Sequence, residues 1–238
     1  MTDIHSHILF DVDDGSKNIE ESITLLKKMK EIGFNNVILT PHYIKDTEYS
    51  AENKEKKIKF NQLKEALIEN NININIYLGN EIFINKDIYE LIKTAQIHTL
   101  NNTRYVLIEL PFHHEIVNLE DTIYELKVKG LIPIIAHPER CTYFQDDYSK
   151  VDALKEEGVL FQANYASILG YYGKSSQKLL KYMLKNRYID YLGTDIHRTV
   201  KTYVIDNFKK IEKQIIKITK NDYYNEIKEN CNKIISEE

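Results

Sequence analysis

The sequence predicts an α/β protein in which about seven strand and helix units close into a barrel. Three observations favour this fold. Short runs of β-branched and apolar residues alternate with longer segments of helical spacing, and the units recur roughly every thirty residues. Histidines and carboxylates also follow these runs one after another, where a barrel carries its reactive groups.

The strand candidates are short and apolar on both faces, as expected for parallel strands covered by helices. They cover residues 1–5, 36–40, 72–78, 105–110, 131–136, 159–163 and 188–192. Polar residues or turn residues follow each candidate, which indicates where the strand ends and the chain reverses direction.

The clearest helix candidate covers residues 18–32, with apolar side chains recurring on one face. Asn18 and Glu21 have the spacing of a capping box at its start, and Gly33 marks its end. The same periodicity predicts four further helical segments or helix pairs at 48–70, 119–128, 175–184 and 200–237. Placed between the strands, these segments complete the alternating pattern of a barrel.

Length and charge set limits on organisation and partners. The 238 residues contain 42% hydrophobic residues, enough for a full core, and no Gly, Ser or Pro-rich linker divides them, so we expect a single domain over 1–238. A formal net charge of -4 gives no general attraction to nucleic acid or to anionic lipid. We therefore expect no nucleic-acid partner.

The cysteines and the apolar runs indicate a cytoplasmic protein. Cys141 and Cys231 are far apart and form no CxxC motif, which argues against a disulfide framework and a thiolate zinc site. The beginning, MTDIHSH, lacks the basic and apolar pattern of an export signal, and the apolar runs are too short to span a bilayer. We expect no membrane insertion.

Side chains that commonly bind metals follow most of the predicted strands. In strand order they are His5 and His7, His42, Glu81, Glu109, His137, and Asp195 with His197. Any one of them alone is more often an ordinary loop or core residue, but the joint pattern favours a shared site. Imidazole and carboxylate donors without thiolates are typical of a site for Mn, Fe or Zn.

Six motifs carry a family resemblance: DIHSHILFDVDDG, TPHY, GNEI, IEL, AHPER and GTDIHR. In this order they resemble the polymerase and histidinol phosphatase (PHP) superfamily, and more narrowly its bacterial manganese-dependent protein tyrosine phosphatases of capsule and exopolysaccharide operons. The likeness extends from residue 1 to about Arg198. It implies a distorted seven-stranded (β/α) TIM-like barrel that holds two or three Mn²⁺ ions.

The resemblance also implies a ligand set. His5, His7, Glu81 and Asp195 correspond to the ligands of one ion, and Glu81, Glu109 and His137 to those of a second, with Glu81 bridging. Asp14, His42 and His197 correspond to the ligands of a third ion. Asp14 is chosen over Asp13 because it adjoins Gly15.

Such a cluster supports hydrolysis of a phosphate ester, because adjacent cations activate water and neutralise the phosphoryl oxygens. Arg140 lies three residues after His137 and is suited to donate to the phosphate. A phenol leaves with little protonic help, and His42 or His197 is the candidate general acid. Arg198 is a candidate for a second phosphate contact, with Lys201 as the alternative, because TDIHRTVK departs from the family pattern at this point.

Other catalytic classes lack their motifs here. A cysteine phosphatase needs an arginine about six residues after its nucleophile, whereas after Cys141 the next arginine is Arg187. The sequence also lacks a GxxxxGK[ST] loop, a GxGxxG motif and a GxSxG motif, which argues against nucleotide-binding and serine-hydrolase functions.

The resemblance implies hydrolysis of phosphotyrosine on a protein, on the tyrosine-rich tail of a membrane-associated bacterial tyrosine kinase that controls capsule synthesis. Because fold and metals do not fix specificity, a small phosphomonoester such as histidinol phosphate remains the main alternative. A 3′ exonuclease, as in the polymerase branch, and a non-catalytic scaffold with a structural metal cluster are further alternatives. The net charge argues against the exonuclease.

Overall fold

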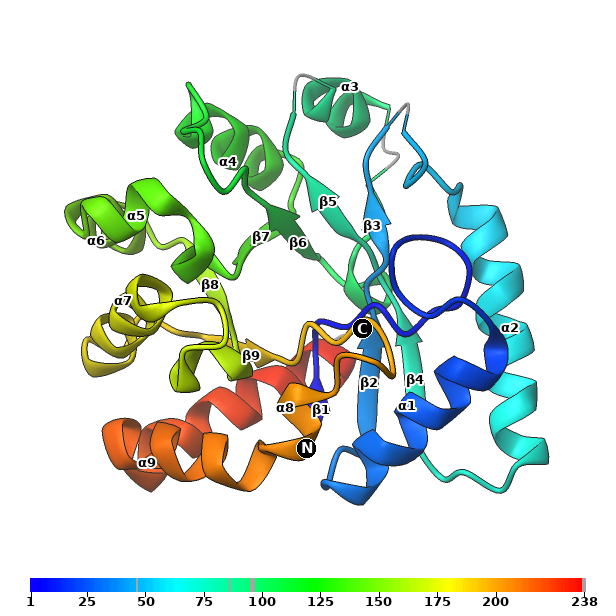
Figure 1. Ribbon diagram of the computed structural model, residues 1–238. Helices are drawn as coiled ribbons and strands as arrows, with labels where there is room; N and C mark the ends of the chain where they lie inside the picture. The colour runs from blue at the N-terminus through cyan, green and yellow to red at the C-terminus, as the bar shows by residue number, and fades with distance from the viewer. Residues whose placement is uncertain (46, 86, 95–96, 237–238) are drawn as a thin grey trace.

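The computed structural model describes residues 1–45, 47–85, 87–94 and 97–236. Within these residues, parallel strands form two sheets, one of three strands in the order β1-β2-β4 and one of six in the order β3-β5-β6-β7-β8-β9. The strands are β1 (Thr2–Asp3), β2 (Asn36–Leu39), β3 (His42–Tyr43), β4 (Asn75–Leu78), β5 (Glu81–Phe83), β6 (Tyr105–Glu109), β7 (Ile132–Ala136), β8 (Leu160–Asn164) and β9 (Tyr191–Gly193). Helices surround them on the outside (Figure 1).

The two sheets are parts of one barrel, because the ladder breaks where the second and third predicted strands end and then resumes in β3 and β5. β2 and β3 are separated by Thr40 and Pro41, and proline lacks the N–H that would continue the ladder. β4 and β5 are likewise separated at residues 79 and 80. Before the breaks, β2 pairs with β1 and with β4; after them, β3 pairs with β5, which pairs onward with β6.

The ring closes between the segments that follow β9 and β1. Ser6 and Ile196 form a parallel bridge, and the amide N–H of Asp195 donates to the carbonyl of His5 at 2.9 Å. The buried carboxylate of Asp3 also accepts hydrogen bonds from the amide and hydroxyl of Thr194, at 2.9 and 2.5 Å. The predicted seven-stranded α/β barrel is confirmed, and its distortion lies in the two broken strands.

Helices form in all five predicted segments, and three further helices at 88–93, 142–146 and 149–156 were not predicted. The helices are α1 (Ile19–Glu31), α2 (Asn53–Glu69), α3 (Ile88–Lys93), α4 (Leu119–Val128), α5 (Thr142–Asp146), α6 (Ser149–Glu156), α7 (Lys174–Lys185), α8 (Tyr203–Asp206) and α9 (Phe208–Ser236). Three 3-10 turns lie at η1 (Leu100–Asn102), η2 (Pro138–Arg140) and η3 (Tyr165–Leu169). α9 contains a non-helical residue at Lys220 and packs along β1, β9 and η3, which covers the closing point of the barrel.

The capping box of α1 forms with a small shift. The side chain of Asn18 accepts a hydrogen bond from the amide of Glu21 at 2.9 Å, as predicted. Glu21 reaches back to the amide of Lys17, one residue before the cap, also at 2.9 Å. This leaves its other carboxylate oxygen facing the residues that follow β9.

Candidate active site

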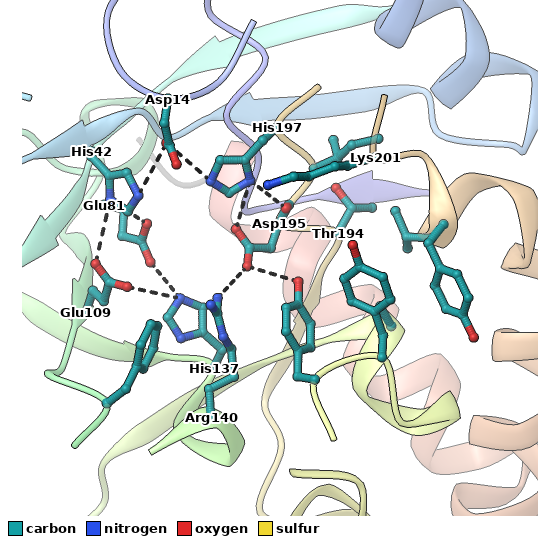
Figure 2. Close-up of a pocket in the computed structure, with 17 residues that line it drawn as sticks. Asp14, His42, Glu81, Glu109, His137, Arg140, Thr194, Asp195, His197 and Lys201 are labelled. Carbon is teal, nitrogen blue, oxygen red and sulfur yellow. Dashed lines mark hydrogen bonds and ion pairs between the residues drawn. The ribbon is translucent and has the colours of Figure 1, made fainter. Parts of the chain in front are cut away.

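The predicted site residues meet at the carboxyl ends of the strands, around a cavity of about 290 Å³. Figure 2 shows carboxylates and imidazoles from separate strands pointing toward one another. The cavity is lined by Asp14, His42, Glu81, Glu109, Phe112, His137, Arg140, Ala166, Tyr171, Tyr172, Thr194, Asp195, Ile196, His197, Lys201, Tyr203 and Val204. His5 and His7 lie beneath it, fully buried.

Glu81 is the centre of the cluster. Its two carboxylate oxygens lie 3.3 Å from Nε2 of His5 and 3.2 Å from Nε2 of His7, and these two nitrogens are 3.2 Å apart. His137 approaches one of the same oxygens to 2.8 Å. Donor atoms of His5, His7 and Glu81 can therefore share one ion.

A second group of donor atoms consists of His42, Glu81 and Glu109. The Nδ1 atom of His42 lies 3.1 Å from Glu81 and 3.6 Å from Glu109. His137, which the sequence placed in this group, is 3.9 Å from Glu109. The structure brings these predicted ligands together and adds His42 beside them.

The third group lies toward the solvent and contains His7, Asp14, His42 and His197. Oδ1 of Asp14 is 3.4 Å from Nε2 of His197 and 3.8 Å from Nε2 of His42. The rings of His7 and His197 are stacked with centroids 3.9 Å apart. The three predicted members thus lie together, and His7 joins them from below.

Asp195 lies between the groups. Its Oδ1 atom is 3.5 Å from His7 and 3.6 Å from both His5 and His197. Its Oδ2 atom accepts hydrogen bonds from Arg140 at 2.9 Å and from the side chain of Asn164 at 2.7 Å. One oxygen thus faces the imidazoles, and the other is held by the surrounding protein.

Asp13 has a role that the sequence did not reveal. Its Oδ2 atom accepts from Nδ1 of His7 at 2.8 Å and from the backbone amide of His42 at 2.9 Å. Although burial opposes it, the neighbouring His7 lowers the pKa of this carboxyl to about 2. A Cβ atom at Gly15 would overlap the carbonyl oxygen of His7, so the glycine lets this loop place Asp13 behind His7 and Asp14 in the cavity.

Two polar side chains of β8 hold the other side of the cluster. Oε1 of Gln162 lies 2.8 Å from Nδ1 of His5, which leaves Nε2 of that ring to face Glu81. Gln162 donates to Asn164 at 3.0 Å, and Asn164 donates to Asp195. Asn164 thus orients Asp195.

Two of the predicted ligands have left-handed backbone conformations. His137 has φ of 31° and Asp195 has φ of 52°. Such conformations are costly outside glycine and concentrate at functional sites. Close packing also requires Gly193, because a Cβ atom there would lie 2.6 Å from Cβ of His5. The backbone is therefore shaped to aim these side chains.

The electrostatics of the cluster reflect crowded negative charge. Burial raises the pKa of Glu109 to about 8, and the charge of Glu81 adds to this effect. Burial disfavours a charged His5, but Glu81 and Asp195 outweigh it and raise its pKa to about 9. Burial lowers the pKa of His137 to about 4. Carboxylates this close together repel one another, and positive charge between them would relieve that repulsion.

The residues present fit divalent cations. Among the described residues, Nδ1 of His42, Oε2 of Glu81 and Nδ1 of His137 are buried and form no hydrogen bond, although the first two lie 3.1 Å apart. Buried polar atoms are normally paired, so unpaired donors inside one cluster of ligand-type side chains favour cation binding. A mixture of imidazole and carboxylate suits Mn, Fe or Zn better than Mg.

Arg140 is held rigidly at the edge of the cavity. Its guanidinium lies between the rings of Phe112 and Tyr172, at 4.3 and 4.5 Å from their centroids, and it donates to Asp195. Arg198, the other predicted phosphate contact, is instead 3.3 Å from Glu21 and does not line the cavity. Lys201, the alternative candidate, does line the cavity.

Cys141 is adjacent to Arg140 but is not placed as a nucleophile. Its side chain is fully buried, and burial raises the pKa of the thiol to about 12. The reactive form of cysteine is the thiolate, which such a pKa excludes near neutral pH. The structure agrees with the sequence on this point.

A parallel barrel whose strand ends carry a histidine and carboxylate cluster defines the class of metal-dependent barrel hydrolases. Residues 1–236 match the family described as capsular polysaccharide synthesis, CpsB/CapC. This chain belongs to the CpsB/CapC family, which confirms the narrower family resemblance read from the six motifs.

Relatives and solved structures agree with this assignment. The chain is 38% identical to the putative tyrosine-protein phosphatase CapC of Staphylococcus aureus over 197 residues, covering 83% of this chain and 77% of that protein. It is 33% identical to the tyrosine-protein phosphatase YwqE of Bacillus subtilis over 202 residues, covering 85% and 79%.

The fold comparison extends to both ends of the chain. One solved structure comes from work on YwqE from Bacillus subtilis and CpsB from Streptococcus pneumoniae, which are described as metal-dependent tyrosine phosphatases. It superimposes on this chain with a TM-score of 0.89 at 29% identity, covering 99% of this chain and 94% of that one. An amidohydrolase from Mycoplasma synoviae, at 12% identity and a TM-score of 0.66 over 99% and 87% of the two chains, shares the fold alone.

Proposed function

We propose that this protein is a metal-dependent protein-tyrosine phosphatase of capsule or exopolysaccharide synthesis, with residues 1–238 forming one phosphoesterase domain. The observation that carries the proposal is the convergence of donors from separate strands around Glu81, next to Arg140, in one cavity. Relatives that the chain matches over most of their length are named tyrosine-protein phosphatases.

The proposed cations are Mn²⁺, with Fe or Zn as alternatives, because the donors are imidazoles and carboxylates. His5, His7, Glu81 and Asp195 would hold one ion, and Glu81, Glu109 and His137 would hold a second. Asp14, His42 and His197 would hold a third. The distances support adding His42 to the second group and His7 to the third.

When bound, such cations lower the pKa of a shared water and neutralise charge on the phosphoryl oxygens. Arg140, fixed between two rings, donates to the nonbridging phosphate oxygens as charge builds on them. Lys201 supplies a second positive charge at the cavity wall. A phenol with a pKa of about 10 leaves with little protonic help, so the reaction needs no general acid; a nitrogen of His42 or His197 that holds a cation has no proton to give.

The proposed substrate is phosphotyrosine on a tyrosine-rich tail of a membrane-associated bacterial tyrosine kinase, and the proposed location is the cytoplasm. The family assignment supports the capsule pathway, and the two free, buried cysteines suit a reducing compartment. The described residues contain no helix that is both long and apolar enough to cross a membrane.

A direct test compares turnover of a phosphotyrosyl peptide and histidinol phosphate by the Mn²⁺-loaded protein. We expect the peptide to be the better substrate and Glu81→Gln to abolish turnover, since Glu81 contacts both buried imidazoles. Glu120→Gln, on the exposed face of α4, is the matched control and should retain full activity. Preference for histidinol phosphate would overturn the substrate proposal and favour the small-molecule alternative.

A further inference from the structure

The cavity has two chemically different halves. One half presents seven donor side chains, Asp14, His42, Glu81, Glu109, His137, Asp195 and His197. The other half is aromatic and apolar, with Tyr171, Tyr172, Tyr203 and Val204 in its wall. In Figure 2, His42, Glu81 and Glu109 lie on one side of Asp195, and Thr194 and Lys201 lie on the other.

The aromatic half is a continuous series of ring contacts. Tyr203 stacks on Tyr171 with centroids 4.7 Å apart and planes 23° apart. Tyr171 meets Tyr172 edge to face at 4.9 Å, and Tyr172 covers the guanidinium of Arg140 at 4.5 Å. The series therefore leads from the phosphate-binding arginine outward along one wall.

Tyr171 is the exposed member of this series. This residue is 44% exposed although its ring touches two others, whereas Val204 in the same wall is buried. An aromatic face that is fixed by stacking yet open to a cavity can receive another ring at little conformational cost. The hydroxyl groups of the wall are not needed for such a contact.

We propose that Tyr171 and Tyr203 form a platform for the aromatic ring of the substrate and so determine selectivity for phosphotyrosine over phosphoserine. The proposal rests on the phosphatase function proposed above and adds the residues that select the substrate. A phosphate bound at the donor half places the ester-linked ring toward the tyrosine wall. A phosphoserine side chain has no ring and gains nothing from that wall.

The size of the cavity supports an extended peptide segment as the bound form. A volume of about 290 Å³ is at the low end of ligand pockets and suits one side chain rather than a folded element. The platform then acts on the ring, and the peptide backbone lies outside the cavity.

The test uses the Mn²⁺-loaded full chain and two peptides of identical sequence that carry phosphotyrosine or phosphoserine. Tyr171→Ala should lower kcat/KM for the phosphotyrosyl peptide about fivefold, mainly through KM, and leave kcat/KM for the phosphoseryl peptide within about twofold. Tyr171→Phe keeps the ring and should behave as wild type. Tyr203→Ala should show the same pattern as Tyr171→Ala.

Tyr124→Ala is the matched control, because Tyr124 is 65% exposed on α4 and does not line the cavity. Metal content and melting temperature of each variant report on the fold. An equal loss on both peptides, or no loss with Tyr171→Ala, overturns the platform while leaving the phosphatase function intact. A wild-type protein that is inactive on both peptides overturns the phosphatase function itself, and the platform with it.

Discussion

Nδ1 of His7 lies 2.8 Å from the carboxylate of Asp13, which also accepts the backbone amide of His42. One buried acid therefore orients the imidazole of His7 and fixes the backbone at His42, without lining the cavity. Carboxylates that fix metal-binding histidines in this way typically contribute 10- to 100-fold to metal affinity.

Asp13→Asn should weaken Mn²⁺ binding about tenfold or more, because the amide cannot hold a protonated Nδ1 as strongly. Titration calorimetry measures the change. Asp11→Asn is the control, since the side chain of Asp11 is 72% exposed and pairs with Lys59. Equal affinity of the two variants would contradict a role for Asp13 in orienting His7.

Arg140→Lys should lower kcat on the order of 100-fold with little change in metal content, because lysine cannot donate in a fork to phosphate or lie flat between two rings. Steady-state kinetics with an aryl phosphate measure the loss. Arg187→Lys, at a half-exposed site beside Glu226, should leave kcat unchanged. Full activity of the Arg140 variant would remove it from the mechanism.

Removal of the cations should lower the stability of the protein as well as its activity. At a free Mn²⁺ concentration about 100 times Kd, each site adds about 2.7 kcal/mol to the free energy of unfolding. Chelation should therefore lower the melting temperature, and added Mn²⁺ should restore it in a concentration-dependent way. A melting temperature independent of Mn²⁺ would count against cation binding at the cluster.

Glu21→Gln should destabilise the protein by about 2 kcal/mol at pH 7, because Glu21 accepts from the amide and hydroxyl of Thr199 and pairs with Arg198. Burial of Glu21 opposes its ionisation. The hydrogen bonds from the Lys17 amide, from Thr199 and from Arg198 outweigh burial and lower the pKa of Glu21 to about 2. Because folding lowers this pKa, the ionised carboxylate stabilises the folded state at pH values above the ordinary pKa of 4.5. This contribution is lost as the pH falls toward 2.

The difference in stability between wild type and Glu21→Gln should therefore be constant from pH 7 to 5 and shrink below about pH 4.5. Urea unfolding at several pH values measures it. Glu20→Gln, in the same turn and exposed, is the control and should behave as wild type. A difference that grows on acidification would show that the sign is wrong.

The barrel could be predicted from the sequence. The clustering of the ligand candidates could be predicted as well, because parallel strands of a barrel end at a common face. His42 and Glu81 illustrate this, since both follow predicted strands and lie 3.1 Å apart. The bounds of α1 could also be predicted, because apolar periodicity and the cap at Asn18 are local signals. The break at Pro41 had a local cause as well, although it was not predicted.

The remaining features depend on contacts that no local pattern reports. Arg198 was expected at the phosphate, but its partner Glu21 lies 177 residues away in the chain. The roles of Asp13 and Gln162 as supports of His7 and His5 likewise require the folded backbone. Asp13 and Asp14 are adjacent in DVDDG, and the motif alone does not say which of them enters the cluster and which supports it from behind.

The closure of the barrel between Ser6 and Ile196 has a consequence for synthesis of the chain. His5 and His7 leave the ribosome well before Asp195 and His197, which complete their surroundings. Contacts this distant in sequence form slowly. A nascent chain that stops short of Ile196 lacks part of its donor set, so acquisition of the full complement of ions belongs to the last stage of folding.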